Sequence, residues 1–160
     1  MPGKLQQEIE QTRPFELVEE EAMLNIVRTA EVLQRTIADF LNGFGLSSVQ
    51  YNVLRILRGA GPAGATCSQI GKRMLTHDPD ITRLLDRMEA RGLIARARDG
   101  ADRRAVITRI TETGLALVGE IDQPLKILFQ TRLGKVGREE LASLTSQLEK
   151  VREAFGLQTE

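Results

Sequence analysis

The chain has 160 residues, with 22 lysines and arginines against 22 aspartates and glutamates, so its formal net charge is zero. This balance argues against a protein that coats nucleic acid through a uniform positive charge. The hydrophobic share of 41% excludes the composition of disordered chains, and the length suits one domain that buries its own core.

The composition also bears on compartment and cofactors. No apolar run approaches the roughly 18 residues needed to cross a bilayer, and the N-terminal stretch MPGKLQQEIEQTRPFELVEEE is polar and acidic. The single cysteine, Cys67, agrees with a reducing compartment. The single histidine, His77, leaves no cluster of metal ligands. We therefore expect a cytoplasmic protein with no membrane partner, no metal and no cofactor.

The first predicted elements are two helices. Apolar residues recur at near-helical spacing over residues 15–41, and the following Asn-Gly-Phe-Gly stretch suits a helix end. Ser47 and Gln50 then form the S-x-x-Q pattern of a capping box, which predicts a second helix that ends near Arg58.

Two shorter helices are expected next. After the break GAGPAGA, Thr66 and Gln69 repeat the capping pattern for a short third helix. Asp78-Pro79 pairs a capping residue with a proline at the first helical position, so a fourth helix is expected to begin there. Its buried side is predicted to carry Ile81, Leu84, Leu85 and Met88, and it ends at Arg91-Gly92.

A β-hairpin and two further helices complete the chain. Residues 93–98 and 105–110 read as strands, and Asp-Gly-Ala-Asp between them is hairpin-turn chemistry. Thr111 can cap a fifth helix, which Pro124 should kink or split, and a last helix is expected over about 138–155. The predicted fold class is mainly α with a small β-wing.

The hairpin ARARDGADRRAVITRI, residues 95–110, contains five arginines. Residues 72–109 carry ten lysines and arginines against six acids, a local balance of +4, so the other residues together carry −4. The element order is that of a winged helix-turn-helix, in which a helix fits the major groove and a two-stranded wing reaches the backbone and the minor groove. The pattern therefore predicts a protein that binds double-stranded DNA.

Four runs in order, GLSSVQYNVLRIL, SQIGKRM, ITRLLDRMEARGLI and RDGADRRAVITRITETG, resemble the MarR family of bacterial transcription regulators. The resemblance implies a single domain over 1–160, with a winged-helix DNA-binding region at 46–111 and dimerisation helices at 12–45 and 112–160. It also implies a homodimer on a pseudo-palindromic operator, expected to act as a repressor and to be released by a small aromatic effector. The apolar stripes of the terminal helices support dimerisation independently.

The resemblance assigns expected roles to individual residues. Thr82 and Arg83 match an exposed T-R pair that reads bases. Asp102, Arg103 and Arg104 match a D-R-R wing, with Arg103 as the minor-groove arginine and Arg104 as the partner of Asp86 on the recognition helix. The candidate DNA contacts are Ser47, Lys72, Arg73, Asp80, Thr82, Arg83, Arg87, Arg98, Arg103 and Arg104, with Asp86 and Asp102 supporting the wing.

Some features leave alternatives open. Asp78 and Asp80 can cap a helix or accept a hydrogen bond from cytosine N4, and capping is favoured. Leu75 stands where the family's turn has glycine, so the turn is expected to be longer or differently bent. For Cys67 a buried apolar role is favoured over a reactive thiol.

Two other functions compete with DNA binding. A winged-helix module could instead bind an acidic protein, and a steep salt dependence of binding to duplex DNA would distinguish the two. An enzyme is disfavoured because the chain has one histidine, one cysteine and no glycine-rich phosphate loop after a strand.

Overall fold

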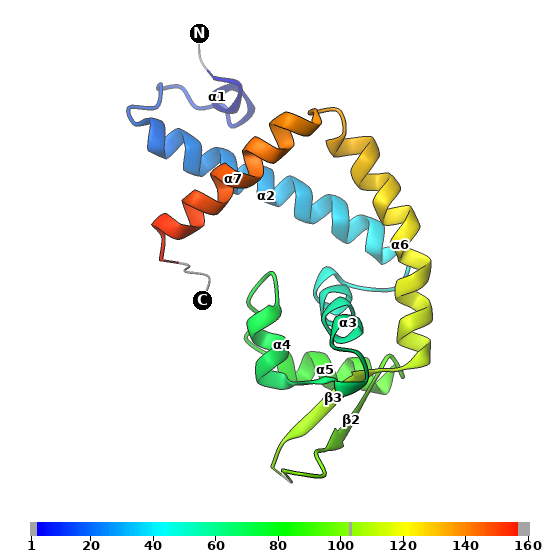
Figure 1. Cartoon of the computed structure of the whole chain (residues 1–160). Helices are drawn as coiled ribbons and strands as arrows, with labels where there is room; N and C mark the ends of the chain where they lie inside the picture. Colours follow the sequence, from blue (N-terminus) through cyan, green and yellow to red (C-terminus); the bar gives the residue numbers. More distant parts are fainter. Residues whose placement is uncertain (1–2, 103, 157–160) are drawn as a thin grey trace. The chain divides into compact units, whose positions relative to one another are not determined.

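The computed structural model describes residues 3–102 and 104–156, and its ribbon is shown in Figure 1. The chain divides into two compact units, of which the first ends at Gly114 and the second begins at Leu115. The elements are mostly helices, with one small antiparallel sheet in the order β1-β3-β2. The predicted fold class, mainly α with a β-wing, is confirmed.

The first unit begins with α1 (Lys4–Glu8) and the long helix α2 (Val18–Asn42). The sequence predicted α2 but not α1, which buries only Leu5. At the end of α2, Gly45 adopts a positive φ of 70°, and the Leu46 backbone N–H donates to the Leu41 carbonyl at 3.2 Å. A glycine therefore turns the chain out of α2, as predicted.

Helix α3 (Ser48–Ala60) starts at a complete capping box. The Ser47 hydroxyl accepts from the Gln50 backbone N–H at 3.2 Å, and the Gln50 side chain accepts from the Ser47 N–H at 3.0 Å. Two backbone donors that the helix leaves unpaired are thus satisfied. The predicted start of this helix is confirmed.

The next segment contains η1 (Gly61–Ala63), β1 (Ala65–Thr66) and α4 (Cys67–Arg73), and α4 starts at the second predicted capping box, between Thr66 and Gln69. Strand β1 was not predicted. It pairs with the central strand and places Ala65 opposite Thr108. Gly64 permits this approach, because a Cβ there would lie 2.5 Å from the Thr108 carbonyl oxygen and its φ is 69°.

Helix α5 (Ile81–Ala90) begins later than predicted. The Asp78 carboxylate accepts from the Asp80 backbone N–H at 2.8 Å, which holds this stretch in a turn, and Asp80 caps the helix instead. The prediction that Asp78-Pro79 starts the helix is therefore wrong. Seven residues, 74–80, connect α4 to α5 through bends and a turn, and Leu75 lies in this connection.

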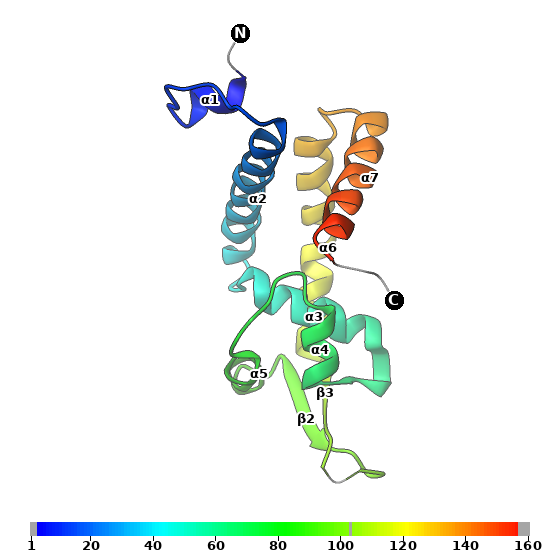
Figure 2. The same cartoon turned by 90° about the vertical axis from the view of Figure 1, so that its left-hand side faces the viewer.

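Strands β2 (Ile94–Arg98) and β3 (Val106–Ile110) form the predicted hairpin, which extends away from α3, α4 and α5 in both views (Figures 1 and 2). Ile94 pairs with Ile110, and the register continues to Arg98 opposite Val106. Gly92, with a φ of 71°, turns the chain from α5 toward this hairpin.

The base of the hairpin and α5 rest on one core. Its fully buried side chains come from α3, α4, α5, β2, the end of α2 and the loop that follows it. They include Leu41, Leu46, Val53, Leu54, Leu57, Ile70, Leu85, Met88 and Ile94. Burial of each such side chain stabilises the fold by roughly 1.5–3 kcal/mol relative to exposure. The positions of the recognition helix and the wing thus follow from packing within the first unit.

Helices α6 (Glu112–Leu133) and α7 (Arg138–Ala154) complete the chain. The Thr111 hydroxyl accepts from the Gly114 N–H at 3.1 Å, as predicted for a cap. Pro124 lies inside α6, which remains one helix rather than splitting there. Among the described helices, none has the length and apolar content needed to span a membrane.

Candidate nucleic-acid interface

Helix α5 presents a polar face to solvent. Leu84, Leu85 and Met88 are buried, whereas Thr82 and Arg83 are exposed. The exposed face repeats at helical spacing through Asp86 and Arg87, so it forms one continuous stripe. The predicted base-reading side chains, Thr82 and Arg83, are therefore accessible to base edges in a DNA groove.

Arg83 forms an exposed ion pair with Asp80 at the start of this stripe. The Arg83 Nε lies 3.3 Å from Asp80 Oδ2, while Asp80 Oδ1 accepts from the Arg83 backbone N–H at 3.3 Å. One turn later, the Arg87 Nε donates to the Arg83 carbonyl at 3.3 Å. Asp80 therefore acts both as the helix cap and as the ion-pair partner of Arg83.

Arg96 joins the hairpin to α5. Its Nη2 donates to Asp86 Oδ1 at 2.5 Å and to Glu89 Oε2 at 2.6 Å, and its Nε donates to Glu89 Oε2 at 2.9 Å. The Arg96 backbone N–H also donates to Glu89 Oε1, at 3.0 Å. Both the side chain and the backbone of β2 are thus tied to the recognition helix.

This cluster corrects the expected partner of Asp86. Asp86 pairs with Arg96, so the prediction that Arg104 fills this role is wrong. Arg104 lies near the far end of the hairpin, where its backbone N–H donates to the Asp102 carboxylate at 2.9 Å. Arg96 sits on the strand that leaves α5 directly, and this proximity decides the pairing. Sequence reasoning missed Glu89, and its only signal was a carboxylate seven residues before an arginine across the Gly92 turn.

The contacts in the Arg96 cluster shift the pKa values of Glu89 and Arg96. The hydrogen bond from the Arg96 side chain holds the pKa of Glu89 below the usual glutamate value, against a smaller opposing effect of desolvation. The hydrogen bonds to Glu89 and then to Asp86 raise the pKa of Arg96. Glu89 and Arg96 are therefore both charged at neutral pH, and the link between α5 and β2 is ionic.

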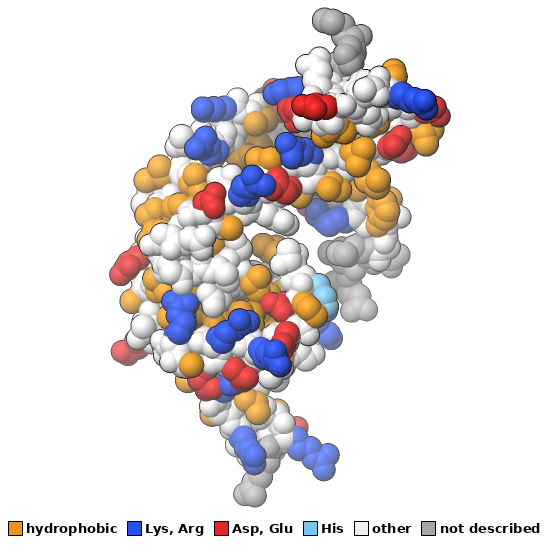
Figure 3. All heavy atoms as spheres, turned by 180° about the vertical axis from the view of Figure 1, so that it is seen from behind, with side chains coloured by type: hydrophobic (Ala, Val, Ile, Leu, Met, Phe, Trp, Pro, Cys, Tyr) orange, Lys and Arg blue, Asp and Glu red, His pale blue; other side chains and the backbone are white. Residues whose placement is uncertain are grey.

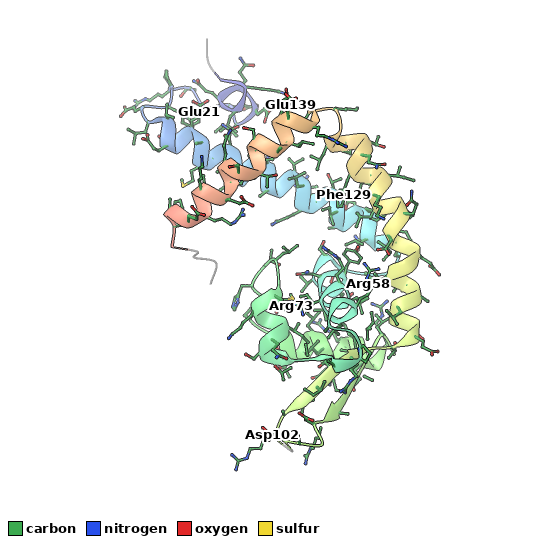
Figure 4. The ribbon with its side chains drawn as sticks, viewed as in Figure 1. Glu21, Arg58, Arg73, Asp102, Phe129 and Glu139 are labelled. Carbon is green, nitrogen blue, oxygen red and sulfur yellow. The ribbon has the colours of Figure 1, made fainter. Side chains whose placement is uncertain are left out.

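The hairpin tip is organised by its aspartates. The Asp99 N–H donates to the Ala105 carbonyl at 2.8 Å, and the Asp99 carboxylate accepts from the Ala101 N–H at 3.3 Å. Asp102 supports the turn through Arg104, as described above. Figure 4 shows Asp102 at the end of the hairpin. The predicted groove arginine, Arg103, lies outside the described residues.

The remaining candidates lie on the first unit. Arg98 and Arg104 are exposed on the hairpin, and Lys72 and Arg73 are exposed at the end of α4. Figure 3 shows basic side chains on the projecting hairpin and, mixed with carboxylates, on the helices above it. Ser47 already serves as a cap, so only its hydroxyl hydrogen is left to donate to a phosphate.

Three further residues bear on the expected chemistry. Arg109 donates from Nε to the Pro62 carbonyl at 2.7 Å, so this hairpin arginine supports η1. Cys67 is half-buried, not fully buried as expected. His77 is exposed, and within residues 3–102 and 104–156 no group of three histidine, cysteine or acidic side chains is arranged to hold a metal ion.

Comparison with known proteins adds independent information. A family model described as "MarR family" matches residues 44–105. The HTH-type transcriptional regulator MhqR of Bacillus subtilis is 28% identical over 73% of this chain and 82% of its own length.

Two solved structures are similar over most of their length. A MarR transcription factor from Planctomyces limnophilus is 36% identical, with a TM-score of 0.65, over 84% of this chain and 98% of that one. PcaV of Streptomyces coelicolor, a transcriptional regulator solved with its natural ligand, is 26% identical, with a TM-score of 0.67, over 79% of this chain and 90% of that one. These proteins are regulators, and none of these comparisons points to an enzyme.

Proposed function

Because the chain belongs to the MarR family of DNA-binding transcriptional regulators, we propose that it is a repressor that binds a pseudo-palindromic operator as a homodimer. In this proposal α5 lies in the major groove and the β2–β3 hairpin reaches the adjacent minor groove. The candidate contacts come from α5, the hairpin, the end of α4 and the cap of α3, and they are Thr82, Arg83, Arg87, Arg98, Arg103, Arg104, Lys72, Arg73 and Ser47.

One observation carries the proposal most directly. The four hydrogen bonds from Arg96 to Glu89 and Asp86 fix an arginine-bearing hairpin against the helix whose exposed face carries Thr82 and Arg83. A helix and a wing held at one angle can engage two neighbouring grooves together, which a loosely joined hairpin would do only at an entropic cost. This arrangement also disfavours a module that binds an acidic protein, since such a partner needs no exposed helix face with base-reading residues.

The exposed apolar side chains support dimerisation. On α2, Met23, Val27 and Val32 are each at least half exposed, and on α7 Leu144 and Val151 are more than a third exposed. Helical stripes of this kind are normally covered by another apolar surface. A second copy of the chain would cover them and would present two recognition helices to one operator.

Release by a small aromatic effector is also part of the proposal. Its support is the similarity to PcaV, which was solved with its natural ligand. An effector of this kind would act by binding the DNA-competent and DNA-free states with different affinities.

The proposal is tested first with a binding selection on random duplex DNA. We expect enrichment of an inverted repeat and, for Arg103→Ala, a loss of about 1 to 3 kcal/mol in operator binding with the fold unchanged. The wild-type protein should show a steep linear fall of log affinity with log salt. A selection without enrichment, together with weak salt dependence, would favour the protein-interaction module. Repeating the selection with aromatic acids present tests the effector.

A further inference from the structure

Asp80 uses its two oxygens for different tasks. Oδ1 accepts from the Arg83 backbone N–H and caps α5, while Oδ2 lies 3.3 Å from the Arg83 Nε. Capping of the helix requires only the contact made by Oδ1. The second oxygen contacts the side chain that the proposed function places against the bases.

The contact leaves a defined part of the Arg83 guanidinium available. The guanidinium atom in this ion pair is Nε, so the two terminal nitrogens, Nη1 and Nη2, are left to form a fork of donors toward DNA. The Arg83 side chain is 81% exposed, and within the part of the chain that the structure describes no other acid contacts it. A fork of two donors matches a pair of neighbouring acceptors. In the major groove guanine offers such a pair, O6 and N7, whereas adenine offers one acceptor beside a donor.

We propose that Asp80 is a specificity-determining residue that directs the Arg83 fork onto a guanine, so that each operator half-site contains a G·C pair at the Arg83 position. This inference rests on the proposed function. Asp80 acts as a positioning residue, because the base contact itself is made by Arg83.

The attraction between Asp80 and Arg83 should differ between the free protein and the DNA complex, and this difference can be measured. In the free protein the pair is exposed and contributes little to stability. In a groove the same charges are partly desolvated and their attraction is stronger, so the orientation is enforced when DNA is bound. A carboxylate near the phosphates also lowers affinity for any duplex. Removal of its charge should therefore strengthen binding to random DNA while discrimination at one base pair falls. The loss of a helix cap would not produce this combination.

The test compares wild type with Asp80→Asn, Asp78→Asn and Arg83→Ala. Asparagine caps a helix as well as aspartate does, so Asp80→Asn removes the charge but keeps the cap. Asp78→Asn is the matched control, since it removes the same charge two residues earlier in the chain. The Asp78 carboxylate contacts the Asp80 backbone N–H and not Arg83. Each protein is titrated against the selected operator and against duplexes in which each base pair is changed in turn.

We expect wild type to prefer G·C by about tenfold or more at one symmetric position, and Arg83→Ala to abolish this preference. Asp80→Asn should reduce it to about threefold or less at the same position, whereas Asp78→Asn should retain it. The double variant Asp80→Asn with Arg83→Ala should resemble Arg83→Ala alone.

Several outcomes would overturn the inference: a base other than guanine at the position sensitive to Arg83, equal effects of the two aspartate variants, or an Asp80 effect at a different base pair. Circular dichroism checks that helix content is unchanged. If wild type itself selects no operator, the proposed function fails instead, and this result is distinct from a selective wild type whose preference does not depend on Asp80.

Discussion

At the scale of single residues, Arg96 determines how the wing is attached. Its guanidinium contacts Asp86 and Glu89, and its side chain is only 22% exposed, less than Lys4, Arg35 or Arg83 in the other ion pairs between described residues. Ion pairs in such positions fix geometry more than they stabilise the fold. Loss of Arg96 should therefore affect the mobility of the hairpin and the binding of DNA before it affects folding.

Arg96→Gln should raise the pKa of Glu89 toward the ordinary glutamate value, because the hydrogen bond that lowers it is lost. The sign follows from linkage: a lowered folded-state pKa stabilises the wild type above the ordinary glutamate pKa, and this contribution disappears as the pH falls through the lowered value. An NMR titration of the Glu89 carboxyl group measures the shift.

Arg98→Gln provides the control for this titration. Arg98 lies two residues along the same strand and is exposed. The Glu89 pKa should be the same in Arg98→Gln as in wild type. An unchanged Glu89 pKa in Arg96→Gln would show that the cluster does not persist in solution.

At the scale of elements, the two glycines before β1 explain how a two-residue strand can pair with the edge of the sheet. Gly61 and Gly64 both have positive φ with ψ near 180°, at −150° and −163°, a region open almost only to glycine. They differ in surroundings: a Cβ at Gly61 meets nothing within 4 Å, whereas a Cβ at Gly64 clashes with the Thr108 carbonyl. Gly64 is therefore needed for two reasons: its backbone conformation has a positive φ, and a side chain there would prevent the close approach of β1 to β3.

Gly61→Ala should lower the free energy of unfolding by about 1–3 kcal/mol through backbone strain alone. Gly64→Ala should lower it further, by about 3 kcal/mol or more in total, because β1 must also move away from β3. Urea denaturation of both variants measures the difference. Equal losses would mean that β1 is not held against the sheet in solution.

The elements that sequence reasoning found are those with local signals. The capping boxes at Ser47 and Thr66 are complete within four residues, and the hairpin turn is held by its own two aspartates. The missed features lack such signals. Strand β1 is too short to show alternation, and either Asp78 or Asp80 could cap α5 on local grounds.

The expected site was predictable to a similar extent. The exposed side of α5 follows from helical periodicity, so Thr82 and Arg83 could be placed on it. The partner of Asp86 could not be placed, because it depends on how β2 leaves α5 in three dimensions. Arginine is common throughout this hairpin, and spacing alone does not separate the roles of Arg96, Arg104 and Arg109.

At the scale of the whole molecule, the proposed function requires two copies of the chain on one operator. Two recognition helices read an inverted repeat together when they lie about 34 Å apart, one turn of B-form DNA. The stripe on α2 offers an apolar surface to a second copy, because Val27 is 59% exposed and Met23, one turn earlier, is 51% exposed.

Val27→Glu should shift the protein from dimer to monomer in analytical ultracentrifugation. A carboxylate that becomes buried without a partner costs about 3 kcal/mol or more, which corresponds to a roughly hundredfold weaker dimer. Thr29→Glu adds the same charge at an exposed polar position of the same helix and should leave the dimer intact. The monomer contacts only one half-site, so Val27→Glu should also bind the operator more weakly and with about half the dependence on salt, because about half the phosphate contacts are lost. A Val27→Glu protein that remains dimeric would mean that α2 does not form the interface.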